Sequence, residues 1–322
     1  MAAKAKPALN LGAATREAFG RALVELGREN KDIVACDADL AKSTMTVYFQ
    51  KEFPERFFSY GIAEANMVAQ AAGMAYAGKI PFVASFSAFV INKGFEQLRV
   101  CVAYPRLNVK VVGTHSGISI GEDGPSQMSV EETGLACSLP GFVVLSPADE
   151  PSTKALVHAA AAHVGPVFIR TGRPKVPMIY GADQKFEIGK AIEVMEGSDV
   201  TIIANGLLVA EAIRASESLE AEGIHARVLD MHTVKPLDRE AIRRAAVETG
   251  AIVTAEEHLV DSGMGVRVAQ VVSELQPCPM EFVGIQDTYA ESGTPEQLLE
   301  KYGLLAPDVI AAVRRVLARK RR

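Results

Sequence analysis

Residues 63–86 read AEANMVAQAAGMAYAGKIPFVASF, and this stretch decides the fold class. Its first part, from Ala63 to Tyr76, is apolar and long enough for several helical turns. Its last part, from Pro81 to Phe86, is a short apolar run of the kind found in buried strands. A helical pattern followed at once by such a strand is typical of parallel sheets that carry helices on both faces. We therefore predict an α/β fold.

The same alternation extends in both directions along the chain. In the first half, the predicted strands are Asp32 to Cys36, Pro81 to Phe86, Val109 to Gly113, Phe142 to Leu145 and Pro166 to Arg170. The helices predicted there cover 12–28, 63–76, a segment ending near Tyr104 and a segment that Asp149 caps. In the second half, the predicted strands are Val200 to Ala204, Ala226 to Leu229, Ile252 to Thr254 and Glu281 to Val283. One helix there starts at the capping box Thr294 to Gln297, and the last carries an apolar stripe of Val309, Ala312, Val313, Val316 and Leu317.

Between the two series the periodicity lapses into a segment punctuated by proline and glycine, from Pro174 to Gly189. We predict a first domain over residues 1–176, a linker over 177–189 and a smaller α/β domain over 190–322.

The composition is that of an ordinary globular protein. Among 322 residues, 34 are Lys or Arg and 39 are Asp or Glu, which gives a net charge of −5. Because no apolar stretch is long enough to span a membrane and the start lacks a secretion signal, we expect a cytoplasmic protein. The only dense basic run is Arg319 to Arg322, so we expect no nucleic-acid binding. The cysteines show no metal-ligand or disulfide spacing, so no bound metal is predicted; they are Cys36, Cys101, Cys137 and Cys278.

Polar and aromatic residues gather just after the predicted strands of the first half. In open parallel sheets, ligands bind beyond the carboxyl ends of the strands. Four segments qualify as parts of a binding site: 37–43, 59–64, 85–89 and 113–127.

Glu64 is the strongest single candidate for a functional residue, because the next fourteen residues, 65–78, carry no charge. A carboxylate at a helix start can simply complement the helix dipole. In apolar surroundings, however, a carboxyl group gains a tendency to hold or share a proton near neutral pH. Phe86 and Phe89 are likewise either core residues or a stacking wall for a planar ligand.

Positive and polar side chains suggest a second function of the same edge. The glycine-rich segment 113–125 carries His115 and Asp123, and its glycines allow close approach of a ligand to the backbone. Arg173 follows a strand beside Gly172, where a guanidinium can bind a phosphate through two hydrogen bonds. Each arginine, including Arg16, can also be an ordinary surface charge.

Taken in order, six strings resemble the pyrimidine-binding and C-terminal domains of transketolase, a thiamine diphosphate enzyme. They are ATRE (14–17), DADLAKST (37–44), SYGIAEANM (59–67), FVASFSAF (82–89), THSGISIGEDGPSQMSVEE (114–132) and FIRTGRP (168–174). The resemblance implies a pyrimidine-binding domain of the thiamine diphosphate fold followed by a transketolase C-terminal domain. It implies transfer of a two-carbon ketol unit from a ketose phosphate to an aldose phosphate, in pentose phosphate metabolism.

For the cofactor, the resemblance implies that Glu64 hydrogen-bonds N1′ of the aminopyrimidine and favours its imino tautomer. The 4′-imino group then takes the proton from C2 of the thiazolium. Phe86 and Phe89 form the aromatic wall against the pyrimidine, together with Asn92, which stands where many family members have tyrosine.

For the substrate, the resemblance assigns phosphate contacts to Arg16, Ser43, His115 and Arg173 and a donor hydroxyl to Asp123. His115 is also implied in catalysis. So is Gln127, which stands where bacterial and yeast-like members have histidine; an amide can orient a group but cannot titrate.

One motif of full-length transketolases, Gly-Asp-Gly, occurs nowhere in this sequence. In the family it holds Mg²⁺ or Ca²⁺ and the cofactor's diphosphate. The resemblance therefore implies a split enzyme, in which an N-terminal partner subunit brings this motif and the two chains form an α₂β₂ heterotetramer.

Two other functions stay open at this point. A β subunit of a 2-oxo acid dehydrogenase has the same fold, but it does not need Arg16, Ser43 and Arg173 together. A non-catalytic scaffold or regulatory subunit could keep the motifs without using them.

Overall fold

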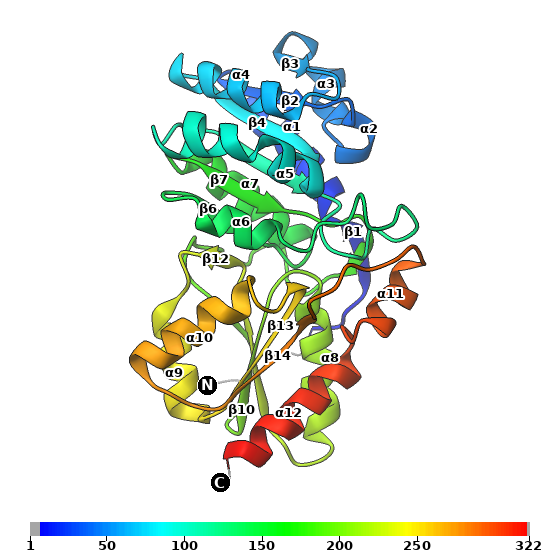
Figure 1. Cartoon of the computed structure of the whole chain (residues 1–322), viewed down its shortest axis with the longest axis vertical. Helices are drawn as coiled ribbons and strands as arrows, with labels where there is room; N and C mark the ends of the chain where they lie inside the picture. The colour runs from blue at the N-terminus through cyan, green and yellow to red at the C-terminus, as the bar shows by residue number, and fades with distance from the viewer. Residues whose placement is uncertain (1–6, 321–322) are drawn as a thin grey trace.

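The computed structural model describes residues 7–320, which form two parallel-type sheets stacked end to end along the molecule (Figure 1). The first sheet has seven strands in the order β12-β6-β7-β5-β4-β2-β3. Its strands are β2 (Ile33–Asp37), β3 (Phe57–Ser59), β4 (Ile80–Phe86), β5 (Lys110–Thr114), β6 (Val143–Leu145), β7 (Val167–Arg170) and β12 (Thr233–Lys235). All of its pairings are parallel except that between β12 and β6.

Helices cover both faces of this sheet because each has one apolar face that needs burial. They are α1 (Thr15–Glu29), α2 (Ala41–Thr44), α3 (Val47–Glu52), α4 (Glu64–Tyr76), α5 (Ser87–Gln97), α6 (Glu132–Ser138) and α7 (Glu150–Ala162), with a short 3₁₀ turn (Pro54–Arg56) and a π-helical segment (Leu98–Ala103). Phe19 and Leu23 of α1 pack with Phe82 of β4 on one face, and Met67 and Val68 of α4 lie in the core on the other.

The second sheet has five strands in the order β14-β13-β10-β11-β9. They are β9 (Ile192–Met195), β10 (Val200–Ala204), β11 (Ala226–Asp230), β13 (Ile252–Leu259) and β14 (Met280–Ile285). Its helices are α8 (Leu208–Glu220), α9 (Arg239–Thr249), α10 (Met264–Leu275), α11 (Pro295–Lys301) and α12 (Ala306–Lys320). Only the edge strand β9 runs antiparallel to its neighbour.

The predicted α/β class is confirmed, and so are the two predicted helix starts. Asp149 and Thr294 each accept a hydrogen bond from a backbone N–H three residues on, in complete capping boxes. Arg319 and Lys320 belong to α12, while Arg321 and Arg322 of the predicted basic run lie outside the described residues. Within residues 7–320, no helix combines the length and the apolarity that crossing a membrane requires.

The sheets are not independent of each other. Strand β12 comes from the second half of the sequence but pairs with β6 of the first sheet, and the backbone N–H of Ser146 donates to the carbonyl of His232 at 2.8 Å. A small antiparallel pair of β1 (Leu11–Ala14) and β8 (Lys175–Pro177) closes the start of the predicted linker. The predicted domain limits stay a prediction, and the junction between the domains is a shared hydrogen-bonded surface.

Candidate active site

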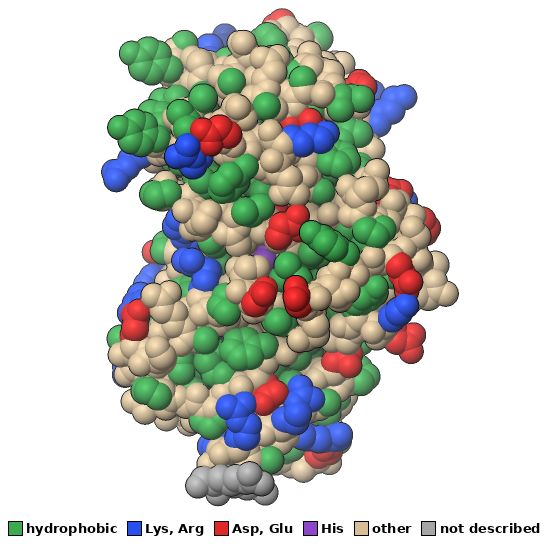
Figure 2. Space-filling model, in the orientation of Figure 1, with side chains coloured by type: hydrophobic (Ala, Val, Ile, Leu, Met, Phe, Trp, Pro, Cys, Tyr) green, Lys and Arg blue, Asp and Glu red, His purple; other side chains and the backbone are tan. Residues whose placement is uncertain are grey.

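The site lies where parallel strands of the first sheet end together. Strands β2, β4, β5 and β7 are neighbours and parallel, so their carboxyl ends meet at one edge. Phe86 is the last residue of β4, and the segments that follow the other three strands carry Ser43, His115 and Arg173. The long loop after β5 lies at the waist of the molecule (Figure 1), where Figure 2 shows acidic side chains and one histidine.

Three stacked rings lie at this edge of the sheet, at the carboxyl end of β4. The rings of Phe86 and Phe89 lie 5.4 Å apart at an interplanar angle of 18°, because α5 begins directly after β4 and places them one turn apart. The imidazole of His115 stacks on Phe86 with ring centres 3.9 Å apart. Phe86 is therefore held between two rings, and Phe89 is the partly exposed member of the stack.

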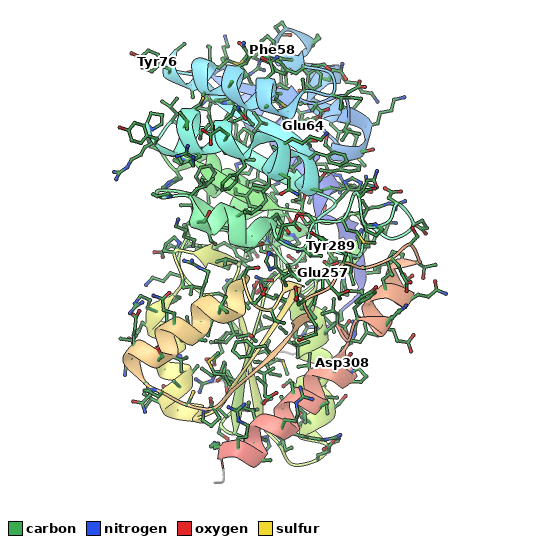
Figure 3. The ribbon with its side chains drawn as sticks, viewed as in Figure 1. Phe58, Glu64, Tyr76, Glu257, Tyr289 and Asp308 are labelled. Carbon is green, nitrogen blue, oxygen red and sulfur yellow. The ribbon has the colours of Figure 1, made fainter. Side chains whose placement is uncertain are left out.

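Glu64 lies at the first position of α4 and is 2% exposed (Figure 3). Its carboxylate oxygens accept hydrogen bonds from the Lys93 ammonium at 3.1 and 3.2 Å. The same ammonium lies 4.4 Å from the ring centre of Phe89, in a cation–π contact. Lys93 thus joins the buried carboxylate to the aromatic stack.

Two arginines and a histidine form a cationic group beside the stack. The Arg16 guanidinium donates to the Ser43 carbonyl at 2.7 Å, and the same nitrogen lies 3.1 Å from Nε2 of His115. Burial, together with the charges of Arg16 and Arg173, lowers the pKa of His115 to about 3. His115 is therefore neutral near pH 7. Because arginine is only a donor, Nε2 accepts and the proton is on Nδ1, which lies 2.9 Å from the Thr114 hydroxyl.

Arg173 completes this group. Its guanidinium donates to the carbonyl of Ile120 and lies 3.2 Å from Glu122 and 4.0 Å from Asp123. The guanidinium thus holds the glycine-rich loop near Arg16 while remaining about one third exposed. Such an arrangement can bind an anion that displaces the exposed carboxylates.

Comparison with known proteins identifies both halves of the chain. The family model of the transketolase pyrimidine-binding domain matches residues 12–178, and that of the transketolase C-terminal domain matches residues 189–309. The chain belongs to the transketolase family. It is 43% identical over 292 residues to a putative transketolase C-terminal section of Methanocaldococcus jannaschii, which covers 90% of this chain and 92% of that protein.

Longer and solved relatives agree with this assignment. Human transketolase is 38% identical over 310 residues, and this chain spans 49% of its length. A solved structure described as a split gene transketolase, inactive β4 tetramer, is 51% identical with a TM-score of 0.91, covering 96% of this chain and 100% of that one. The predicted transketolase-type enzyme subunit is therefore confirmed, and a β subunit of a 2-oxo acid dehydrogenase is not favoured.

Most of the residues that the resemblance to transketolase implied lie together at this edge. Two of them make their side-chain hydrogen bonds elsewhere: the exposed Asn92 amide donates to Glu131 at 2.9 Å, and the Gln127 amide oxygen accepts from Ser126. Ser43 reaches Arg16 through its backbone carbonyl and not through its hydroxyl. The roles assigned to all of these residues stay predictions.

The sequence analysis missed Lys93 of this candidate site and assigned no role to Asp37. Lys93 is the only charged residue between positions 80 and 95, which was a usable signal. Asp37, at the end of β2, accepts hydrogen bonds from the backbone of Leu40 and the hydroxyls of Thr44 and Thr46 at 2.6 to 2.9 Å. Its buried carboxylate fixes the turn that carries Ser43. The sequence analysis included segment 37–43 in the site but assigned no role to Asp37 itself.

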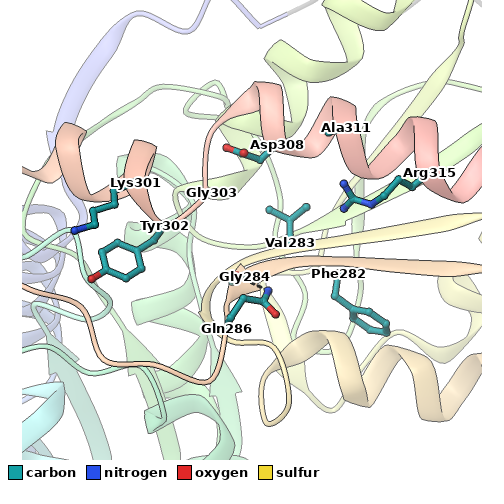
Figure 4. Close-up of a pocket in the computed structure, with 10 residues that line it drawn as sticks. All are labelled: Phe282, Val283, Gly284, Gln286, Lys301, Tyr302, Gly303, Asp308, Ala311 and Arg315. Carbon is teal, nitrogen blue, oxygen red and sulfur yellow. Dashed lines mark hydrogen bonds between the residues drawn. The ribbon is translucent and has the colours of Figure 1, made fainter.

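Among the described residues there is no cluster suited to a metal ion, and the two cations of one surface hollow are paired. Among residues 7–320, no three His, Cys, Asp or Glu side chains are arranged to hold a metal ion. A hollow of about 380 Å³ lies beside β14 and α12, away from the site (Figure 4). Its Arg315 pairs with Glu281 and its Lys301 with Glu291, so these two cations are already neutralised.

Proposed function

We propose that this chain is the subunit of a two-subunit transketolase that binds the pyrimidine half of thiamine diphosphate and the phosphate of the sugar substrates. The reaction moves a two-carbon ketol unit from a ketose phosphate to an aldose phosphate. The carrying observation is that a buried carboxylate, Glu64, and a cationic group of Arg16, His115 and Arg173 lie on either side of one aromatic stack.

The aminopyrimidine ring of the cofactor can contact the same two groups that Lys93 contacts in this structure, Glu64 and Phe89. The ammonium is a cationic N–H donor that bonds Glu64 and lies over Phe89. Once its ring nitrogen N1′ is protonated, or in the imino tautomer, an aminopyrimidine offers the same two features, an N–H toward a carboxylate and a flat face toward an aromatic ring. Bound thiamine diphosphate supplies the nucleophilic carbon of the reaction. In this proposal Glu64 holds the proton at N1′, and Phe86 and Phe89, with Asn92 at the rim, orient the ring.

The substrate phosphate lies against Arg16, Arg173 and the neutral His115. Neutral His115 accepts from Arg16 at 3.1 Å, so it keeps the guanidinium oriented without adding a third positive charge. In the proposal Ser43 contributes from the α2 turn, Asp123 binds a donor hydroxyl, and Gln127 assists at the same loop. Two guanidinium groups provide enough donors for the oxygens of a phosphate monoester.

The diphosphate and its Mg²⁺ or Ca²⁺ belong to an N-terminal partner subunit with the Gly-Asp-Gly motif. The exposed side of α4 and the segment just before it support a surface for this partner. Ile62, before the helix, and Tyr76, at its end, are 78% and 86% exposed, and a Cβ added at Gly61 or Gly73 would meet open space. Figure 2 shows apolar side chains over α4 and α5, and Figure 3 places Tyr76 and Glu64 on the same half. We propose an α₂β₂ assembly acting in the cytoplasm in pentose phosphate metabolism.

The test is ketol transfer by the chain purified alone and mixed with its partner. We expect activity only from the pair, with thiamine diphosphate and a divalent cation. Calorimetry of the pair should show an affinity for thiamine diphosphate that Glu64→Ala removes. A pair with no affinity beyond that of the partner alone would make this chain a scaffold, and a pair that prefers pyruvate to sugar phosphates would overturn the substrate assignment.

A further inference from the structure

The glycine-rich loop that carries His115, Asp123 and Gln127 has no regular secondary structure of its own to hold it. Between β5 and α6 its one bridge joins Gly117 to Ser129, where the N–H of Gly117 donates to the Ser129 carbonyl at 2.7 Å. His115 has a φ of +56°, a value that side-chain-bearing residues rarely adopt. The loop therefore needs support from outside to keep His115 beside Arg16.

Within the first domain, the N–H of Ser116 donates to the carbonyl of Thr171 at 3.2 Å and Arg173 donates to the carbonyl of Ile120. Further support comes from the second sheet. One carboxylate oxygen of Glu257, on β13, accepts a hydrogen bond from the backbone N–H of Ser119 at 2.6 Å. Two residues further on, the N–H of Leu259 donates to the carbonyl of Val130 at 2.9 Å. The end of β13 thus binds both sides of the loop, and Figure 3 places Glu257 at the waist between the two halves.

The fit between Glu257 and Gly117 is close. A Cβ added at Gly117 would lie 2.1 Å from the carboxyl carbon of Glu257, and Gly117 has a φ of +80°. Only glycine leaves room for the carboxylate at this point and adopts this conformation without strain. Although the two residues are 140 positions apart in sequence (257 − 117), the absence of a side chain at Gly117 makes room for the carboxyl group of Glu257.

The carboxyl group of Glu257 is buried at this contact and does not face solvent. Glu257 is 2% exposed, and Arg170 lies 3.8 Å from its second oxygen while donating to its backbone carbonyl at 2.7 Å. Arg170 also binds Glu132, at the start of α6, at 2.6 Å. Burial raises the pKa of Glu257, and Arg170 and the Ser119 amide oppose that rise.

We propose that Glu257 is a positioning residue through which the second domain holds the glycine-rich loop beside the substrate site. This rests on the proposed function for the identity of the substrate, but the contact itself joins two parts of one chain. Glu257 touches no substrate: it fixes Gly117 and Ser119, and these fix His115 two residues before. The second domain then contributes directly to phosphate binding, in addition to any role in assembly.

The test compares Glu257→Ala and Glu257→Gln with a matched control, Glu256→Gln. Glu256 is its buried neighbour, but it accepts from the backbones of Met264 and Gly265 within the second domain. In the assembled enzyme we expect Glu257→Ala to raise KM for the sugar phosphate about tenfold or more with a smaller change in kcat. The KM of Glu257→Gln should lie between those of the parent and Glu257→Ala, because the amide oxygen can still accept a hydrogen bond from the N–H of Ser119. The control should leave KM unchanged.

A second readout does not depend on activity. In the isolated chain, hydrogen exchange at residues 117–119 should become faster in Glu257→Ala and not in Glu256→Gln. Unchanged exchange and unchanged KM in a folded Glu257→Ala variant would overturn the proposal. If that variant does not fold, the same two measurements on Glu257→Gln decide. If the assembled pair transfers no ketol unit, the proposed function fails. The exchange measurement still tests whether Glu257 holds the glycine-rich loop.

Discussion

The ammonium of Lys93 lies 3.1 Å from a carboxylate oxygen of Glu64 and 4.4 Å from the ring centre of Phe89. It fills the gap between the two groups to which we assign the cofactor's pyrimidine. The Lys93 side chain is 47% exposed, so it can turn outward without losing a buried environment. In the isolated subunit it supplies the positive charge that a buried carboxylate requires.

Replacing Lys93 should strengthen cofactor binding, because the ring then no longer competes with an ammonium. For Lys93→Met we expect the apparent Kd of thiamine diphosphate in the assembled enzyme to fall by about three- to tenfold, the upper limit corresponding to one charge-assisted hydrogen bond in a half-exposed position. Titration calorimetry measures this, with Lys79→Met as the control, since Lys79 pairs with Asp32 at the opposite end of the strands. Weaker binding would show that Lys93 contacts the bound cofactor.

Glu64→Gln should nearly abolish turnover while leaving the fold intact. The amide has the same size as the carboxyl group but cannot take up or share a proton, and proton transfer by a placed side chain contributes about 10² to 10⁴ in rate. We expect kcat of the assembled enzyme to fall within this range. Glu96→Gln, on α5 and paired with Arg99, is the matched control and should retain full activity. A Glu64→Gln enzyme with normal kcat would refute the assignment of Glu64.

Arg173→Ala should reduce binding of phosphorylated sugars selectively. Losing charge-assisted hydrogen bonds costs about 1.5 to 3 kcal/mol, which corresponds to roughly a 10- to 150-fold loss in kcat/KM. Because only the phosphate is affected, kcat/KM for an unphosphorylated sugar should change little. Steady-state kinetics with both sugars measures the ratio. Equal losses with both would mean that Arg173 acts by holding the Ile120 carbonyl and the loop.

The sequence predicted those parts of the fold whose burial follows a simple apolar pattern. Strands such as Val200–Ala204 are buried throughout and mostly apolar, and they were placed correctly. Strand β13 runs to Leu259, beyond the predicted Thr254, because its last residues are polar yet buried at the junction of the sheets. Strand β12 was missed for a similar reason: Thr233–Lys235 is short and is a strand only because it pairs with β6.

In the candidate site, too, residues in local sequence strings were predicted, and contacts between distant residues were not. Glu64, Phe86 and His115 stand in local strings that the resemblance could identify, and they lie at one edge because parallel strands end together. The Lys93–Glu64 pair and the contact of Glu257 with Ser119 join residues far apart in sequence. No local pattern encodes such pairs, because each partner alone reads as an ordinary charged residue.

Asp230 should make the stability of the chain depend on pH. Its carboxyl group, at the end of β11, is fully buried; one oxygen accepts from the Tyr180 hydroxyl at 2.7 Å and the other has no partner among residues 7–320. Burial raises the pKa of Asp230 to about 8 from an ordinary value of 3.8. Between these values the folded chain holds a proton that the unfolded chain has released, so the free energy of unfolding falls as pH rises from about 4 to 8.

Asp230→Asn removes this dependence, because an amide stays neutral and can still accept from Tyr180. We expect the variant to match the parent near pH 4 and to gain stability relative to it by about 1.4 kcal/mol per pH unit at most, up to pH 8. Urea denaturation at pH 5, 6.5 and 8 measures the difference between the two proteins. His115 and His232, whose pKa values are lowered to about 3 and about 4 by burial, favour the opposite slope, but they contribute equally to both proteins and cancel in the difference. The exposed Asp261→Asn should give a curve parallel to the parent, and a parallel curve for Asp230→Asn would show that Asp230 is ionised in the fold.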